Sequence, residues 1–179
     1  MSTKAPWPSE ICPLYPVRML SPTATITQIG NDNDARQYQY YGDRNTVTIS
    51  QSGSDNIARQ NQNFGVDNTA SLIQAGLRGF AKQSQEGTAL SASILQGDAG
   101  SDNEAFQSQN GELLTALLEQ TGSSNVARQI QEGTGHFSEV FQPGSFNTVE
   151  VTQTGAVGHT SSVMQSGNNN TATITQSDG

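Results

Sequence analysis

One residue type recurs along almost the whole chain at a nearly fixed interval. Glutamine occupies fourteen successive places separated by 11 to 13 residues. These are Gln28, Gln39, Gln51, Gln62, Gln74, Gln85, Gln96, Gln109, Gln120, Gln131, Gln142, Gln153, Gln165 and Gln176. In eight of the fourteen units an Asn stands six residues before the Gln: Asn33, Asn45, Asn56, Asn68, Asn103, Asn125, Asn147 and Asn170. Periodicity sustained over this length predicts a repeat architecture.

Within each unit the residues alternate with a period of two. Ala or Val stands two residues after the start of most units, and Gln stands six after it. Even offsets share one face of a β-strand, whereas the odd offsets carry Thr, Ser, Arg and Glu. A Gly followed by small polar residues, as in Gly122-Ser-Ser-Asn125, is typical of a turn. The unit is therefore predicted to be a short strand followed by a tight turn, and a helix is excluded.

Neighbouring units differ in a regular way. One set carries a basic residue and then Gln at offsets three and four, as in Ala35-Arg36-Gln37. The other set is interpreted as aliphatic at offset four: Ile26, Ile49, Leu72, Ile94 and Leu117. The structural repeat is thus a pair of strands about 22 to 23 residues long. The alternation fades near the C-terminus, where Val151 and Ile174 replace the Gln.

A two-strand unit cannot bury its inner face alone, so stacking is required. We predict an all-β fold, a β-solenoid of about seven stacked repeats over residues 22–179, with two facing parallel sheets. Stacked Gln and Asn amides would hydrogen-bond along the stack, as in cross-β assemblies. This explains the composition, because Leu, Ile, Val and Phe make up only 34 of 179 residues and the net charge is −8. Taken alone, such values are typical of disordered chains.

Several function classes are excluded by the same sequence. An acidic chain lacks the basic footprint of a nucleic-acid binder. No apolar run is long enough to span a membrane. The single cysteine, Cys12, excludes an internal disulfide framework and a cysteine-rich zinc site. No constellation of an enzyme and no cofactor-binding motif is present, so we expect neither catalysis nor a cofactor.

The recurring pattern is Asn-x-Ala, a Gln four residues after the Ala, and a Gly two residues later. It is matched between Asn45 and Gln62 and again between Asn147 and Gly155. In this respect residues 22–179 resemble the curlin-repeat family, the subunits of curli fibres of Gram-negative bacteria. The sequence departs from the pattern at Gly79, Leu90, Leu114, His136 and His159, where we expect the Asn ladder to be interrupted.

The resemblance implies a structural subunit of an extracellular functional amyloid. Such a fibre assembles by templated stacking, forms part of the biofilm matrix and supports adhesion. Its implied partners are further copies of itself, a nucleator subunit and a dedicated outer-membrane export pore. The regular last unit, with no Lys or Arg after Arg128, favours the major subunit, although Asn-x-Ala at most unit starts is also seen in nucleators.

Residues 1–21 lie outside the repeat and contain four prolines. Proline opposes both helix and ladder pairing, so a flexible segment is predicted, with Cys12 as a free thiol. The segment has no apolar stretch of the length found in a secretory signal. An export address remains one interpretation of this segment, and a cytoplasmic repeat protein remains an alternative for the chain.

Three surface features carry hypotheses. The final strand, through Gln176, presents an open edge that templates a further subunit unless loops cover it. Arg36, Arg59, Lys82 and Arg128 are predicted to form an outward row. The row is interpreted as gatekeepers that slow assembly, as a contact for anionic polymers, or as a solvated face. In the last case it would be balanced by the turn acids Asp32, Asp43, Asp55, Asp67 and Asp102.

His136 and His159 occupy equivalent places 23 residues apart. They suggest neighbouring side chains that form a weak metal site or a pH-sensitive step. The alternative function is a monomeric β-solenoid that binds ice or a glycan. The pair Thr46/Thr48 and the pair Thr171/Thr173 fit an ice-binding array, whereas Ser91, Ser93 and Leu117 break it.

Overall fold

A computed structural model describes residues 22–97 and 100–178. The predictions for residues 1–21, including Cys12, therefore lie outside the described residues. Fourteen strands follow one another, separated by short turns. They are β1 (Thr23–Asn31), β2 (Asp34–Asp43), β3 (Thr46–Ser54), β4 (Ile57–Val66), β5 (Thr69–Gln74), β6 (Phe80–Thr88), β7 (Ser91–Gln96), β8 (Glu104–Glu112), β9 (Thr115–Gln120), β10 (Val126–Thr134), β11 (Phe137–Gln142), β12 (Thr148–Gly155), β13 (Thr160–Met164) and β14 (Thr171–Ser177).

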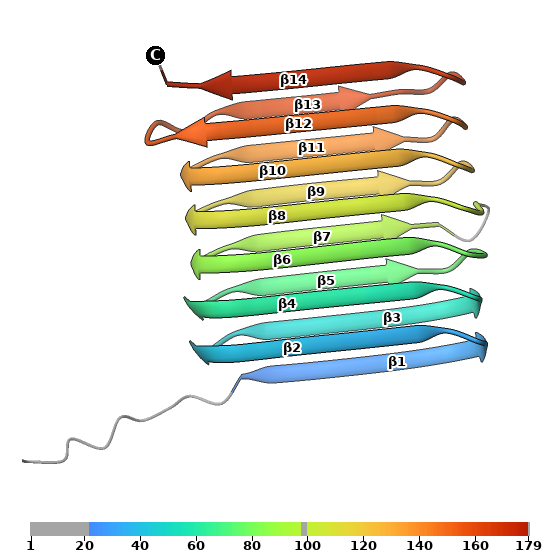
Figure 1. The fold of residues 1–179 in the computed structure, drawn as a ribbon, viewed down its shortest axis with the longest axis horizontal. Helices are drawn as coiled ribbons and strands as arrows, with labels where there is room; N and C mark the ends of the chain where they lie inside the picture. The colour runs from blue at the N-terminus through green and yellow to red at the C-terminus, as the bar shows by residue number, and fades with distance from the viewer. Residues whose placement is uncertain (1–21, 98–99, 179) are drawn as a thin grey trace, which may run out of the picture.

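The strands form two parallel sheets of seven strands each. The odd-numbered strands form one, here called the odd sheet, and the even-numbered strands form the even sheet. Figure 1 shows the resulting stack, in which each turn of the coil adds one strand to each sheet. Equivalent residues of successive turns lie opposite one another, as Gln28 does with Gln51 and Gln131 with Gln153. The predicted all-β solenoid of about seven turns is confirmed.

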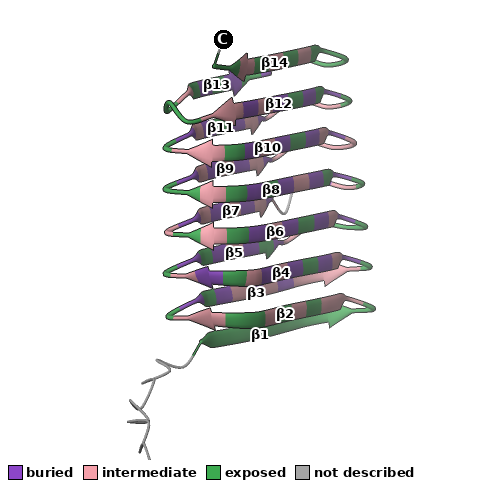
Figure 2. Ribbon diagram, turned by 60° about the vertical axis from the view of Figure 1, so that its left-hand side comes forward, coloured by how far each residue is buried: buried purple, intermediate pink, exposed green. Residues whose placement is uncertain are grey.

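The core is a thin layer between the two sheets, and it is partly polar. Along most strands buried and exposed residues alternate, which Figure 2 shows as bands of colour. Larger aliphatic side chains of the odd sheet face small ones of the even sheet. The buried cluster is Ile49, Leu72, Ile94, Leu118, Val140 and Val163 with Ala58, Ala81, Ala105, Ala127, Val149 and Val151.

One prediction of an inward residue was wrong. The side chain at offset four in the fifth odd unit is Leu118, which is buried, whereas Leu117 faces outward and is only partly buried. The two leucines are adjacent, and a shift of one residue moves a side chain to the opposite face of a strand.

The turns have a recurring backbone conformation. The residue before the first inward position of most units has a positive φ, for example Asp55 at 57° and Leu113 at 56°. Aspartate tolerates this region, but leucine is strained there. Gly111 also has a positive φ of 145°, and a Cβ on it would overlap the carbonyl oxygen of Gly133 in the next turn. Glycine is therefore needed here for close stacking.

The two ends of the coil are less covered than its middle. Every residue of β1 is exposed, and the inward-facing residues of β14 are only partly buried. No described segment pairs with the outer edge of either terminal turn. Residues 22–97 and 100–178 form no helix, and hence none long and apolar enough to cross a membrane.

Candidate functional site: amide ladders and the ends of the coil

All fourteen periodic glutamines join two ladders of side-chain hydrogen bonds. In the odd sheet the Nε2 of Gln51 donates to the Oε1 of Gln74 at 2.8 Å, and this link is repeated from Gln28 to Gln165. In the even sheet the corresponding ladder runs from Gln39 to Gln176. In every link the Nε2 of one Gln donates to the Oε1 of the next Gln toward the C-terminal end of the coil. The ladders therefore have a direction, with unused acceptors at one end and donors at the other.

A third ladder lies beside them, and we had not predicted it. Gln37, Gln60, Gln83, Gln107 and Gln129 are linked in the even sheet by bonds of 2.7 to 3.0 Å. It ends where Val151 follows Gln129 in register, and Gln129 instead donates to the Oγ of Ser138. The signal in the sequence for this third ladder is the Gln that recurs at offset four in alternate units.

The asparagines stabilise the turns between successive rungs. The Nδ2 of Asn45 donates to the carbonyl oxygen of Gly65, and its Oδ1 accepts the backbone N–H of Asn68. The same pattern recurs at Asn33, Asn56, Asn103, Asn125 and Asn147. Asn68 likewise bonds Gly87 and Leu90, and Asn170 closes the series by donating its backbone N–H to Asn147.

Of the positions where Asn is replaced, Gly79, Leu90 and Leu114 interrupt the Asn ladder as expected, whereas His136 does not. Gly79 and Leu90 donate their backbone N–H to the Asn below but have no amide to pass the bond on. His136 replaces the amide, because its Nδ1 accepts the backbone N–H of His159 at 3.1 Å. Its Nε2 lies 3.0 Å from the carbonyl oxygen of Glu132, which assigns the proton to Nε2.

The two histidines are neighbours, as the spacing predicted. Their rings stack with centroids 5.1 Å apart and planes within 3°. Both nitrogens of His136 are already engaged with backbone groups. Among residues 22–97 and 100–178, no group of three or more His, Cys, Asp or Glu is arranged to hold a metal ion. The geometry thus makes His136 a substitute for Asn and leaves it no free nitrogen for a metal.

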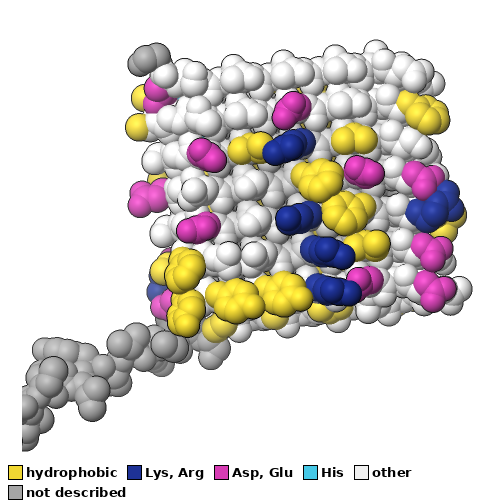
Figure 3. All heavy atoms as spheres, viewed as in Figure 1, with side chains coloured by type: hydrophobic (Ala, Val, Ile, Leu, Met, Phe, Trp, Pro, Cys, Tyr) yellow, Lys and Arg dark blue, Asp and Glu magenta, His cyan; other side chains and the backbone are white. Residues whose placement is uncertain are grey.

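The basic residues lie in one file on the outer face of the even sheet. The register places Arg36 opposite Arg59 and Arg59 opposite Lys82, and then Phe106 separates Lys82 from Arg128. Figure 3 shows this file in dark blue. The gatekeeper role of these residues stays a prediction.

Two of the turn acids pair with arginines outside this file. Asp67 pairs with Arg44, and Asp102 pairs with Arg78 at 2.7 Å, both at the edge of the coil. The hydrogen bonds from these arginines hold the pKa of the Asp67 and Asp102 carboxyls below its usual range. The charges of Asp67 and Asp102 are thus paired locally.

The C-terminal end carries a contact that we had not predicted. Asp178 stands where earlier even units have a Gly, and its carboxylate accepts the N–H groups of Ala156 and Val157. These bonds are the main cause of a pKa of Asp178 below the usual value. The Nε2 of His159 lies 3.1 Å from the same carboxylate, close enough for an ion pair when the imidazole is protonated. Asp178 therefore ties the last turn to the one before it.

Comparison with known families identifies the repeat. Residues 42–76 match the family model of the curlin associated repeat. This segment of the chain is a curlin associated repeat. The matched segment contains β3, β4 and β5, and the registers extend the same unit through the other strands. Comparison with curated proteins and with solved structures found no match. The curlin repeat and the solenoid together support a curli-type structural protein.

Proposed function

We propose that this chain is a self-assembling structural subunit of an extracellular, curli-type amyloid fibre. The observation that carries the proposal is the shared direction of the glutamine ladders. At the N-terminal end the Oε1 atoms of Gln28 and Gln39 accept no described bond, whereas each next Gln accepts one. At the C-terminal end the Nε2 of Gln176 donates only within its own turn, to Thr160. The two ends are therefore complementary.

The backbone supports the same direction of growth. Thr148 donates its N–H to the carbonyl oxygen of Asn170 and lies opposite Thr171 in a parallel ladder. In such a ladder alternate residues direct both backbone groups to the same side. The N–H and C=O groups of Thr171, Thr173 and Thr175 therefore point to the open edge, where a second copy would pair through β2. Soluble proteins block such edges with charge, proline or a covering segment.

The biological setting follows from the resemblance rather than from the geometry. A curli-type subunit would be exported, join a fibre of the biofilm matrix and support adhesion, with a nucleator and an outer-membrane pore as partners. We propose the major-subunit role, because the last unit, which ends at Gln176, is as regular as the central ones.

The test compares two substitutions at one outward position of β14. Thr173→Pro removes a backbone N–H at the open edge, whereas Thr173→Ala keeps it. The purified parent and Thr173→Ala are expected to form unbranched, thioflavin-T-positive fibres seen by electron microscopy. Thr173→Pro is expected to remain unassembled, or to need a much longer lag, with unchanged circular dichroism. Equal assembly of both variants, or a parent that stays monomeric, would overturn the proposal.

The ice-binding alternative is not favoured by the outer face of the odd sheet. The file that begins with Thr25 and Thr48 continues through Ser71 and Ser93, and then Leu117 and Glu139 occupy the same position. A regular array of threonines is therefore absent from the described part of this face.

A further inference from the structure

The outer face of the even sheet concentrates positive charge on a chain whose net charge is −8. Arg36, Arg59, Lys82 and Arg128 are four of the six Lys and Arg residues in the described ranges. Arg36, Arg59 and Lys82 lie on successive strands, one strand spacing of about 4.8 Å apart, so their charges repel one another. A bound anion would relieve this repulsion.

The middle of the file has little compensation from within the molecule. Arg36 pairs with Asp34 at 3.1 Å, and Arg128 only approaches Glu150, at 4.0 Å. In the part of the chain that the structure describes, neither Arg59 nor Lys82 is within 4.0 Å of an acidic oxygen. Their charge is available to an external group.

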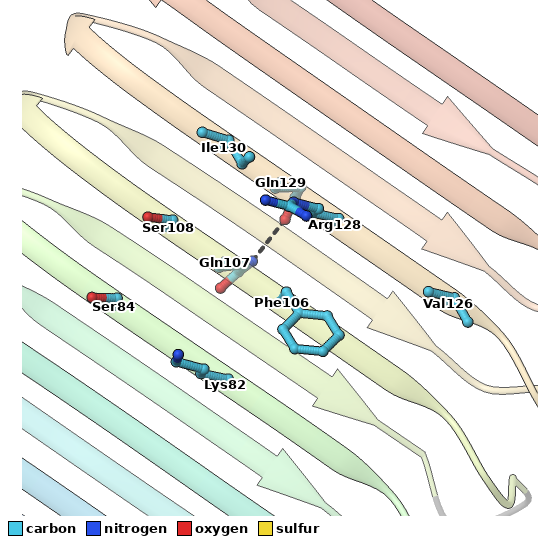
Figure 4. A pocket seen from close by; sticks show the side chains of 9 residues that line it. All are labelled: Lys82, Ser84, Phe106, Gln107, Ser108, Val126, Arg128, Gln129 and Ile130. Atoms are coloured by element: carbon cyan, nitrogen blue, oxygen red, sulfur yellow. Dashed lines mark hydrogen bonds between the residues drawn. The ribbon is translucent and has the colours of Figure 1, made fainter.

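A groove lies where the file crosses Phe106. It has a volume of about 470 Å³ and is bordered by Lys82 on one side and Arg128 on the other. Figure 4 shows Phe106 between these cations, with Ser108 farther along the same strand and Ser84 farther along the strand of Lys82. The Phe106 ring is supported by Phe80, with centroids 5.4 Å apart. Gln107 and Gln129 form the floor of the groove, and the 2.8 Å hydrogen bond between them, part of the third ladder, holds this floor in place.

We propose that this groove binds an acidic polysaccharide whose sugars carry carboxylates. Carboxylates would pair with Lys82 and Arg128, which lie two strand spacings apart, about 10 Å. The apolar face of a sugar ring would pack on Phe106, and sugar hydroxyls would bond Ser84 and Ser108. Nucleic-acid binding depends on neutralising many phosphates, whereas only two cations, Lys82 and Arg128, line this groove. The groove lies within one chain, so binding does not depend on assembly.

The test measures binding of polygalacturonate oligomers to the full chain by isothermal titration calorimetry, before and after assembly. The groove variant is Lys82→Gln/Arg128→Gln. The matched control, Arg44→Gln/Arg78→Gln, removes the same charge at the edge turns. Both replace exposed side chains, and circular dichroism checks the fold. Loss of two exposed ion pairs predicts a Kd about tenfold higher for the groove variant only. Phe106→Ser is expected to weaken binding with the charge unchanged.

Each other outcome contradicts the proposal. Equal weakening by the groove variant and the control would show a nonspecific effect of net charge. Equal binding of a neutral cello-oligosaccharide would remove the role of the cations. Tighter binding of a thymidine oligonucleotide would assign the groove to nucleic acid. A parent that does not bind polygalacturonate in either state would exclude the site, whether or not the chain forms fibres.

Discussion

At the scale of single residues, the amide group explains how a polar interior is tolerated. A Gln or Asn side chain both donates and accepts, so it satisfies the amide below it and passes a bond to the one above. Buried polar groups are costly only when they are left without partners. Gln109 illustrates this, since it accepts from Gln85 and donates to Gln131 and to the carbonyl oxygen of Ser91.

Replacing one ladder residue is therefore expected to destabilise the coil. Gln109→Leu keeps the size of the side chain but leaves Gln85 without its acceptor in the ladder and Gln131 without its donor. Unsatisfied buried groups cost about 1–3 kcal/mol each, so we expect the free energy of unfolding to fall by at least ~2 kcal/mol. Asn110→Ala, on the exposed neighbour in β8, is the control and should be nearly neutral. Equal urea midpoints for the two variants would contradict the ladder's contribution.

Backbone strain in the turns predicts a substitution that raises the free energy of unfolding instead of lowering it. Leu113 has a φ of 56° and is 63% exposed. Shortening its side chain therefore removes little buried apolar contact. Leu113→Gly should raise the free energy of unfolding by ~1 kcal/mol relative to Leu113→Ala, because Gly adopts this backbone without strain. Thermal unfolding of the two variants measures the difference. A lower melting temperature for the Gly variant would show that the turn is not strained.

At the scale of the strands and turns, the last turn has its own stabilising contact. The pKa of Asp178 is lower in the folded chain than in an unfolded one because Ala156 and Val157 donate to its carboxylate. The contact is complete above the ordinary pKa of an aspartate and is lost as the pH falls through the lowered value. Acidification should therefore loosen β14 before the central strands.

Hydrogen exchange measures this effect directly. Protection factors of the Ala156 and Val157 amides are expected to be high at neutral pH and to fall on acidification in the parent chain. In Asp178→Asn they should be low at both pH values, because the charged acceptor is absent. The amides of β8, which lie far from Asp178, provide the internal reference. A parent whose two protection factors do not change with pH would contradict the account.

The sequence predicted the fold because its period, its alternation and its turn residues all indicate the same structure. The inward Gln and Asn positions, the outward file of Arg59 and its neighbours, and the adjacency of His136 and His159 follow from that period. Leu118 was missed since Leu117 and Leu118 are both apolar, and pattern alone does not decide between them. Asp178 was missed because its contact joins β14 to the turn after β12, and such pairing depends on three-dimensional geometry.

The third ladder was missed for a different reason. Gln107 and its equivalents were recognised only as a difference between alternate units, and their bonding depends on neighbours in register. The ability of His136 to replace an amide depends on a tautomer that a sequence does not specify.

At the scale of the whole molecule, the coil is a segment of a structure with no intrinsic stopping point. Its turns repeat with nearly constant register, and both glutamine ladders extend to the terminal turns. Stacking of copies would place Gln28 above Gln165 and Gln39 above Gln176. The hydrogen bonds between neighbouring molecules would then be the same as those between successive turns of one molecule.

Cryo-electron microscopy of fibres grown from the purified chain tests this most directly. We predict unbroken rungs at ~4.8 Å across each subunit boundary, with Gln165 next to Gln28 and Gln176 next to Gln39 of the following copy. Fibres joined through lateral faces, or with a gap between the end of one coil and the start of the next, would contradict end-to-end stacking. The absence of any fibres would contradict it equally.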